Sequence, residues 1–154
     1  MTMKTKIGIV GSRTYTNKRK VKDLIFEIKE KYGNTVEVVS GGQRDGADGY
    51  AKKFALMFGL HYVEFPPSHY SWNMHCIRPA KEYNKPYYVS NYFKRNKQIA
   101  EYCDIIVAFI TEGEVSRGTQ NTIDYAKKEK KLIKIINWYI FIYVYTEVLL
   151  WILN

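Results

Sequence analysis

Short apolar, β-branched runs alternate along this chain with segments in which apolar residues recur at helical spacing. Runs of about four to eight such residues are typical of buried strands, and apolar side chains three and four residues apart are typical of helices. The expected strands are 4–10, 36–39, 61–65, 104–110 and 132–136, and the expected helices are 17–32, 47–58, 90–102 and 118–128. This alternation predicts an α/β fold: a Rossmann-like, three-layer domain with a mainly parallel sheet, helices on both faces and right-handed crossovers.

The chain divides into two parts by composition. With 154 residues it has the length of one domain. We expect residues 1–136 to form the domain and residues 137–154, which are aromatic and apolar, to form a C-terminal tail. Inside the domain, residues 68–88 have the least regular pattern and contain many aromatic residues and two prolines. We expect this segment to be a long excursion that covers a ligand site.

Three polar loops that contain glycine follow three of the expected strands. They are Gly11-Ser12-Arg13, the stretch from Ser40-Gly41-Gly42 to Asp48, and Ser116-Arg117-Gly118-Thr119. In an open parallel sheet, ligands bind outside the carboxyl ends of the strands, where these loops would lie together. Glycine lets the backbone approach a phosphate closely, and the first N–H groups of a helix bind anions. Serine, threonine and arginine add donors. Each loop alone could be a turn and a helix cap, but together they predict a phosphate or ribose site.

Three further residues are site candidates with structural alternatives. Asp48 is expected just inside a helix, where a carboxylate stabilises the helix start and could also bond ribose hydroxyls or orient a loop. Arg95 and Asn96 are expected on the helix before the 104–110 strand, where such a pair is commonly only surface. The three histidines show no metal-ligand spacing with the cysteines, so we expect no metal and no cofactor.

The formal charge of +9 raises the question of a nucleic-acid partner. The basic residues are scattered, with glutamates between them, so we expect a solvated basic surface and no nucleic-acid groove. The charge would nevertheless attract an anionic ligand. Cys76 and Cys103 lie in unrelated contexts and no signal peptide is evident, which favours a cytoplasmic protein.

The ordered set of motifs resembles the SLOG superfamily, named for SMF/DprA and LOG proteins, and within it the YspA-like branch. The resemblance covers roughly residues 5–136, and beside the three loops it rests on Trp72, Arg95-Asn96 and Asp104. It implies a Rossmann-like domain whose loops bind nucleotides or ADP-ribose-like ligands, in some relatives as sensors in bacterial conflict systems. The ligand-binding residues expected here are Gly11, Ser12, Arg13, Ser40, Gly41, Gly42, Asp48, Trp72, Arg95, Asn96, Ser116, Arg117, Gly118 and Thr119.

The enzymatic branch of this superfamily, which releases a base from a nucleoside monophosphate, carries the motif P-G-G-x-G-T-x-x-E. Thr122 stands here at the position of its catalytic glutamate. Threonine has no carboxylate with which to stabilise a ribosyl cation or polarise a water. Asp48, Glu112 or Glu114 could substitute from other loops, so these three are the catalytic candidates if the protein is an enzyme.

The expected function is therefore binding of a nucleotide-derived small molecule, such as an ADP-ribose-type or cyclic nucleotide signal. The protein would sense or sequester it, for example in phage defence or counter-defence, with Tyr70 or Trp72 stacked on the base. The alternative is a nucleotide N-glycosidase or ribosyltransferase of the LOG type. A third reading, a DNA-binding protein of the SMF/DprA kind, is favoured by charge alone.

The tail from Trp138 to Leu153 is too apolar to be left in water. Residues 138–145 favour an added strand and residues 148–153 a short helix. We expect the tail to pack on the domain or on a second subunit, giving a homo-oligomer, dimer or tetramer. Attachment to a membrane or a membrane span is the less favoured alternative, because Glu147 interrupts a rather short stretch. Lysine is absent after Lys134, so a further alternative is that an altered reading frame encodes the tail.

Overall fold

The computed structural model describes residues 3–111, 116–137 and 141–144. In chain order the elements are β1 (Thr5–Gly11), α1 (Lys18–Tyr32), β2 (Val36–Ser40), α2 (Gly46–Met57), β3 (His61–Glu64), α3 (Ser90–Tyr102), β4 (Ile105–Phe109), α4 (Arg117–Lys128), β5 (Leu132–Ile136) and β6 (Phe141–Val144). Two short 3₁₀ helices, η1 (Gly33–Thr35) and η2 (Ala80–Glu82), lie in connections. The nine elements expected before β6 are all present, each within one residue at either end, so the α/β prediction is confirmed.

The sheet has the strand order β3-β2-β1-β4-β5-β6. The pairs from β3 to β5 are parallel, and β6 joins β5 antiparallel. From β1 the chain first builds outward through β2 and β3, and then returns to the other side of β1 with β4. The strand order thus reverses between β1 and β4, which is the point where open α/β sheets leave a crevice for a ligand.

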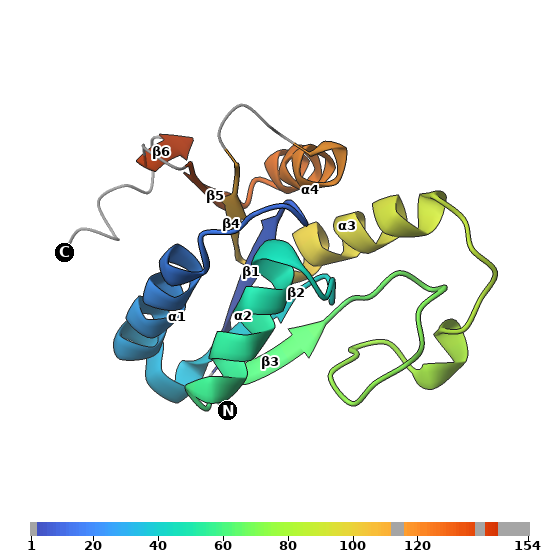
Figure 1. Ribbon diagram of the computed structural model, residues 1–154, viewed down its shortest axis with the longest axis horizontal. Coiled ribbons are helices and arrows are strands. Elements are labelled where there is room, and N and C mark those ends of the chain that lie inside the picture. The colour runs from blue at the N-terminus through green and yellow to red at the C-terminus, as the bar shows by residue number, and fades with distance from the viewer. Residues whose placement is uncertain (1–2, 112–115, 138–140, 145–154) are drawn as a thin grey trace.

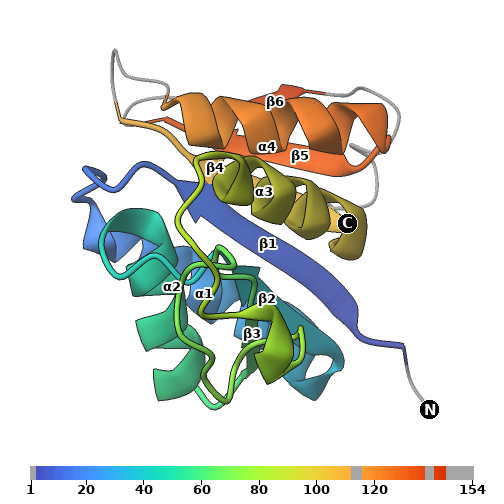
Figure 2. The same ribbon diagram turned by 90° about the vertical axis from the view of Figure 1, so that its right-hand side faces the viewer.

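Helices α1 and α2 cover one face of the sheet, and α3 and α4 cover the other (Figure 1). Side chains alternate along each strand, so that Ile7 and Ile9 of β1 pack in the core under α1 and α2, while Val10 packs in the core under α3 and α4. In β4, Phe109 faces the first core and Ala108 the second. Figure 2 shows α3 and α4 side by side. The three-layer arrangement is therefore built around strands that are buried on both faces.

Two glycines allow α2 to begin directly against the end of β1. A Cβ on Gly11 would lie 2.6 Å from the Cβ of Ala47 and 2.7 Å from the carbonyl oxygen of Phe109. Gly46 has a φ of +73°, and a Cβ there would collide with the carbonyl oxygen of Ser12. These contacts are with backbone or short side chains that cannot move aside. The glycines thus bring the loop after β1 and the start of α2 into contact.

The long connection between β3 and α3 is fastened to β3. The buried carboxylate of Glu64 accepts hydrogen bonds from the Tyr62 hydroxyl (2.7 Å), the Lys52 ammonium (3.3 Å) and the Asn73 amide. The backbone of Glu64 also bonds that of His75 and Ile77. In Figure 1 the connection runs away from β3 before the chain returns as α3. The buried acid thus holds this segment at the sheet edge, and its expected role of covering a ligand site stays a prediction.

The described part of the tail is the strand β6, which extends the sheet. Ile135 pairs with Ile142 and Ile136 with Phe141. An added strand was expected at this place, and its partner is β5 of the same chain. The expected helix at 148–153 lies outside the described residues, and oligomerisation stays a prediction. Among the described residues, no helix is both long and apolar enough to cross a membrane.

Candidate ligand-binding site

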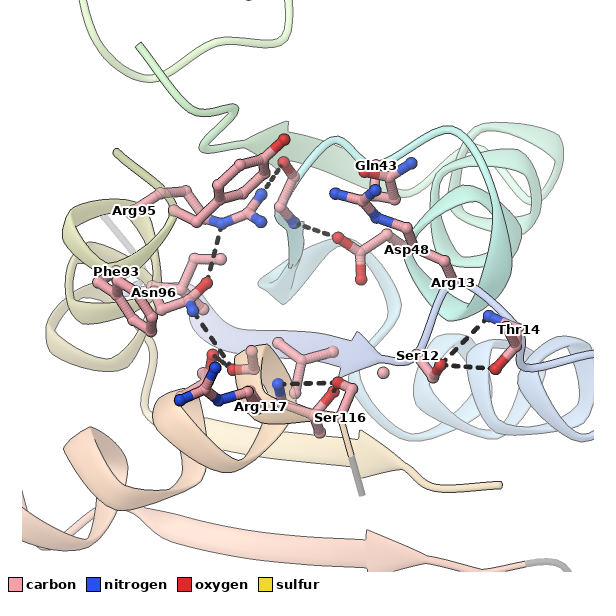
Figure 3. Close-up of a pocket in the computed structure, with 18 of the residues that line it drawn as sticks. Ser12, Arg13, Thr14, Gln43, Asp48, Phe93, Arg95, Asn96, Ser116 and Arg117 are labelled. Carbon is pink, nitrogen blue, oxygen red and sulfur yellow. Dashed lines mark hydrogen bonds between the residues drawn. The ribbon is translucent and has the colours of Figure 1, made fainter. Parts of the chain in front are cut away.

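A cavity of about 480 Å³ opens where the strand order reverses. Its walls come from the loops after β1 and β2, from the first turns of α2 and α4, and from one face of α3. Figure 3 shows the side chains around it, with Phe93, Arg95 and Asn96 on the α3 side and Ser12, Arg13 and Thr14 opposite. Pockets for small ligands commonly have volumes of about 300–1,000 Å³, so this cavity has the right size for one.

Hydroxyl groups line the two loops that meet in the cavity. Ser12 Oγ accepts a hydrogen bond from the backbone N–H of Thr14 (3.2 Å) and bonds its hydroxyl (2.8 Å). In the other loop, Ser116 caps α4: its Oγ accepts from the backbone N–H of Thr119 (3.1 Å) and bonds the Thr119 hydroxyl (2.7 Å). The cap uses one of the N–H groups at the helix start and leaves those of Arg117 and Gly118 without a partner within the helix. Such N–H groups attract anions.

Asp48 and Arg95 hold the Gly41 peptide between them. Asp48 accepts a hydrogen bond from the Gly41 N–H (3.1 Å), and Arg95 donates to the Gly41 carbonyl. A Cβ on Gly41 would lie 2.7 Å from Asp48 Oδ2 and would overlap the Arg95 guanidinium, so only glycine fits. Burial raises the pKa of Asp48 to about 6, although the charge of Arg95 and the Gly41 and Gln43 amides act in the opposite direction. Burial likewise lowers the pKa of Arg95.

Arg95 and Asn96 also connect α3 to the strand ends and to α4. The Arg95 guanidinium donates to the Phe65 carbonyl (3.4 Å) and to Asn96 Oδ1 (2.9 Å). Asn96, which is buried, donates in turn to the Gly118 carbonyl (3.3 Å) and to Asn121 Oδ1 (3.1 Å). The two residues therefore fix the positions of the β2 loop and of the α4 N-terminus relative to each other.

The cavity carries more positive than negative charge. Arg13, Arg95 and Arg117 line it, and among its described lining residues only Asp48 has a carboxylate. Arg13 and Arg117 are exposed, and neither lies within salt-bridge distance of a carboxylate in the described part of the chain. The described residues contain no group of three or more His, Cys, Asp or Glu side chains suited to a metal ion. The electrostatics of the cavity favour an anionic organic ligand.

Most residues expected from the sequence to bind ligand do line the cavity. They are Gly11, Ser12, Arg13, Gly41, Asp48, Arg95, Asn96, Ser116, Arg117, Gly118 and Thr119. Ser40, Gly42 and Trp72 are not among the lining residues. Ser40 is fully buried on the sheet face of Val38, and its Oγ bonds the Tyr62 hydroxyl at 2.7 Å. Trp72 belongs to the connection fastened to β3, and Tyr70 of the same connection is not a lining residue either.

Eight lining residues were not expected from the sequence: Val10, Thr14, Gln43, Val89, Tyr92, Phe93, Ile99 and Thr122. A signal for four of them was present. Val89, Tyr92, Phe93 and Ile99 lie at helical spacing from Asn96, so placing Asn96 at the cavity also places them there. Thr122 points its hydroxyl at the Gly118 carbonyl (3.1 Å). Glu112 and Glu114, the other catalytic candidates, lie outside the described residues.

The strand order and the cavity at its reversal define a Rossmann-like α/β domain with a small-molecule cavity.

No protein-family model matches the sequence, and neither does any curated protein. Solved structures do match. A molybdenum cofactor binding protein from the phototrophic bacterium Rippkaea orientalis is 18% identical, with a TM-score of 0.66 over 89% of this chain and 78% of that one. The molybdenum cofactor carrier protein from Chlamydomonas reinhardtii is 19% identical, with a TM-score of 0.61 over 86% of this chain and 76% of that one. At this identity the likeness is one of fold.

Proposed function

We propose that this protein binds a nucleotide-derived small molecule, such as an ADP-ribose-type or cyclic nucleotide signal, and senses or sequesters it. The observation that carries the proposal is the convergence of three arginines and five serine or threonine side chains on one cavity at the strand-order reversal. Phosphate groups are the ligand chemistry that such donors suit, because arginine binds them bidentately and a helix start adds N–H groups.

In this proposal the phosphates lie between the loop after β1 and the start of α4. Arg13 and Arg117 are exposed there and have no carboxylate partner in the described part of the chain, whereas Arg95 donates to the Gly41 and Phe65 carbonyls. The ribose would face Asp48, whose carboxylate oxygens can accept hydroxyl protons. The same arrangement supports membership of the SLOG superfamily and its YspA-like branch, which we propose on the motifs given above.

The molybdenum cofactor is a second candidate ligand. The reason to consider it is that two solved structures similar to this chain are named as proteins that bind or carry that cofactor. The same cavity would be its site, and elemental analysis of the purified protein distinguishes the two ligands. Molybdenum bound in stoichiometric amount would favour the cofactor, and its absence together with a bound nucleotide would favour the first proposal.

The main test has two stages. Mass spectrometry of small molecules extracted from purified protein identifies what the cavity holds. Calorimetry with ADP-ribose, or with the extracted compound, then measures Arg13→Ala and Arg117→Ala. Losing a charge-assisted hydrogen bond should weaken binding about ten- to a hundredfold in each variant.

Arg44→Ala is the matched control, because Arg44 is an exposed arginine of the β2 loop that does not line the cavity. We expect it to bind almost as the wild type does. Unchanged affinity in both cavity variants, with intact thermal stability, would contradict the site. An equal loss in Arg44→Ala would show that only the overall charge matters.

A further inference from the structure

Phe93 stands out among the residues of the cavity because it is apolar, aromatic and exposed. Its side chain retains 39% exposure in the first turns of α3, and its neighbour on the same helix face, Val89, retains 58%. Of the other apolar lining residues, Val10 and Ile99 are buried, and the polar ones carry hydroxyl, amide, guanidinium and carboxylate groups. An exposed apolar surface beside polar donors is the usual arrangement of a pocket for a ligand with one apolar and one polar end.

Tyr92, the other aromatic residue of the cavity, is already in contact with other groups. The guanidinium carbons of Arg13 and Arg95 each lie 5.7 Å from its ring centroid. Its ring also meets those of His69 and Tyr87 edge-to-face, at 5.1 and 6.5 Å. Phe93 has no ring or cation of this kind beside it among the described residues. Of the two rings, Phe93 is the one without an aromatic or cationic partner in the described part of the chain.

The position of Phe93 relative to the phosphate-binding end follows from α3. Asn96 lies three residues further along the helix, on the same face, and its amide touches the Gly118 carbonyl at the start of α4 (3.3 Å). Three residues correspond to a rise of about 4.5 Å. Phe93 and Asn96 therefore lie about one turn apart on one face of α3, and Asn96 reaches the start of α4.

We infer that Phe93, supported by Val89, is the platform on which the heteroaromatic ring of the ligand stacks. This inference rests on the proposed function and gives the ligand its orientation: phosphate at Arg13 and the α4 start, ring on α3. It also replaces Trp72 and Tyr70, the residues expected from the sequence to cover the base. The ligand class is thus a phosphorylated sugar bearing a flat ring, as opposed to a sugar phosphate alone.

The test compares two probes that share the phosphate end, AMP and ribose 5-phosphate. Phe93→Ala should weaken AMP binding roughly five- to a hundredfold, the range for loss of a base stacked on an aromatic side chain. Ribose 5-phosphate should bind this variant as it binds the wild type. Phe93→Trp should retain AMP affinity and add a fluorescence signal that AMP quenches and ribose 5-phosphate does not. Phe26→Ala is the control, since Phe26 is similarly exposed but lies on α1, across the sheet.

The possible outcomes separate this inference from the proposed function. If the wild type binds AMP and Phe93→Ala binds it equally well, the stacking role assigned to Phe93 is wrong and the proposed binding site is unaffected. If Phe93→Ala weakens both probes alike, Phe93 supports the fold of the cavity and does not stack on the ring, and the inference is also wrong. If the wild type binds none of AMP, ADP-ribose and cyclic nucleotides, and no nucleotide is extracted from it, the proposed function fails and the inference fails with it.

Discussion

Replacing Asp48 by asparagine should stabilise the protein increasingly as the pH rises. The pKa of this buried carboxyl group is raised from 3.8 to about 6. In the unfolded chain the group ionises near its ordinary pKa, while in the folded protein it holds its proton up to about pH 6. Unfolding therefore becomes easier as the pH rises through this window. The destabilising contribution is complete above the folded pKa and absent below the unfolded one.

The magnitude follows from the two pKa values. One pKa unit corresponds to about 1.4 kcal/mol, so ionised Asp48 costs roughly 3 kcal/mol at pH 7.5. At pH 4.5 the unfolded group is already largely ionised, and about 1 kcal/mol of the cost is present. Asparagine does not ionise. Any effect of its different hydrogen bonding is the same at both pH values and cancels. The difference in free energy of unfolding between variant and wild type should therefore widen by about 2 kcal/mol from pH 4.5 to pH 7.5.

Urea unfolding at pH 4.5, 5.5, 6.5 and 7.5, without added ligand, measures this gap. Asp45→Asn is the matched control, because Asp45 is an exposed carboxylate three residues away at the start of the same helix. We expect the control to change the free energy of unfolding little at any of these pH values. A gap for Asp48→Asn that stays constant with pH, or that narrows as the pH rises, would refute the reasoning.

Three further predictions concern the glycines, the chemistry and the tail. Gly41→Ala should unfold at a lower temperature than the wild type, because its methyl group would overlap Arg95 and Asp48. Gly118→Ala, whose methyl group would meet no atom nearer than 4.0 Å, should instead gain roughly 0.5–1 kcal/mol in free energy of unfolding from helix propensity. Similar melting temperatures for the two variants would contradict this prediction. No free base should be released from AMP, because Thr122 has no carboxylate and bonds its own helix; chromatography that detects turnover abolished in Asp48→Asn would instead establish the N-glycosidase. Light scattering should give a multiple of 18.1 kDa, falling to monomer or aggregate when the chain stops at Asn137 and leaves the β5 edge unpaired; a stable full-length monomer would refute the oligomer.

The fold was predictable because its strands and helices are marked locally. The β-branched run that ends at Gly11 and the helical spacing of Val21, Leu24, Ile25 and Ile28 are set by packing against one sheet, and the structure buries these four α1 residues. The loops at the strand ends could also be predicted to meet, because parallel strands place their carboxyl ends at one edge. These signals depend on residues that are close in sequence.

The rest of the site depends on contacts that periodicity does not reveal. Trp72 looked suited to cover a base, but the hydrogen bonds of Glu64 hold its segment against β3. Ser40 sits beside two glycines as a phosphate-binding serine would, yet the side-chain alternation of β2 turns it toward Tyr62. Phe93 was not expected at the site, because an aromatic residue on a helix is more often part of a core.

The strand order also sets the sequence in which β1 can gain its neighbours as the chain is made. Ile7 pairs with Val38 on one side and with Ile105 on the other, so one edge of β1 stays open until most of the chain has been synthesised. The first three strands and their helices can assemble in the meantime. The cavity cannot, because half of its wall comes from α3 and α4. A ligand that binds there can therefore hold the finished molecule together and slow its unfolding, but it has no means of hastening the early steps of folding.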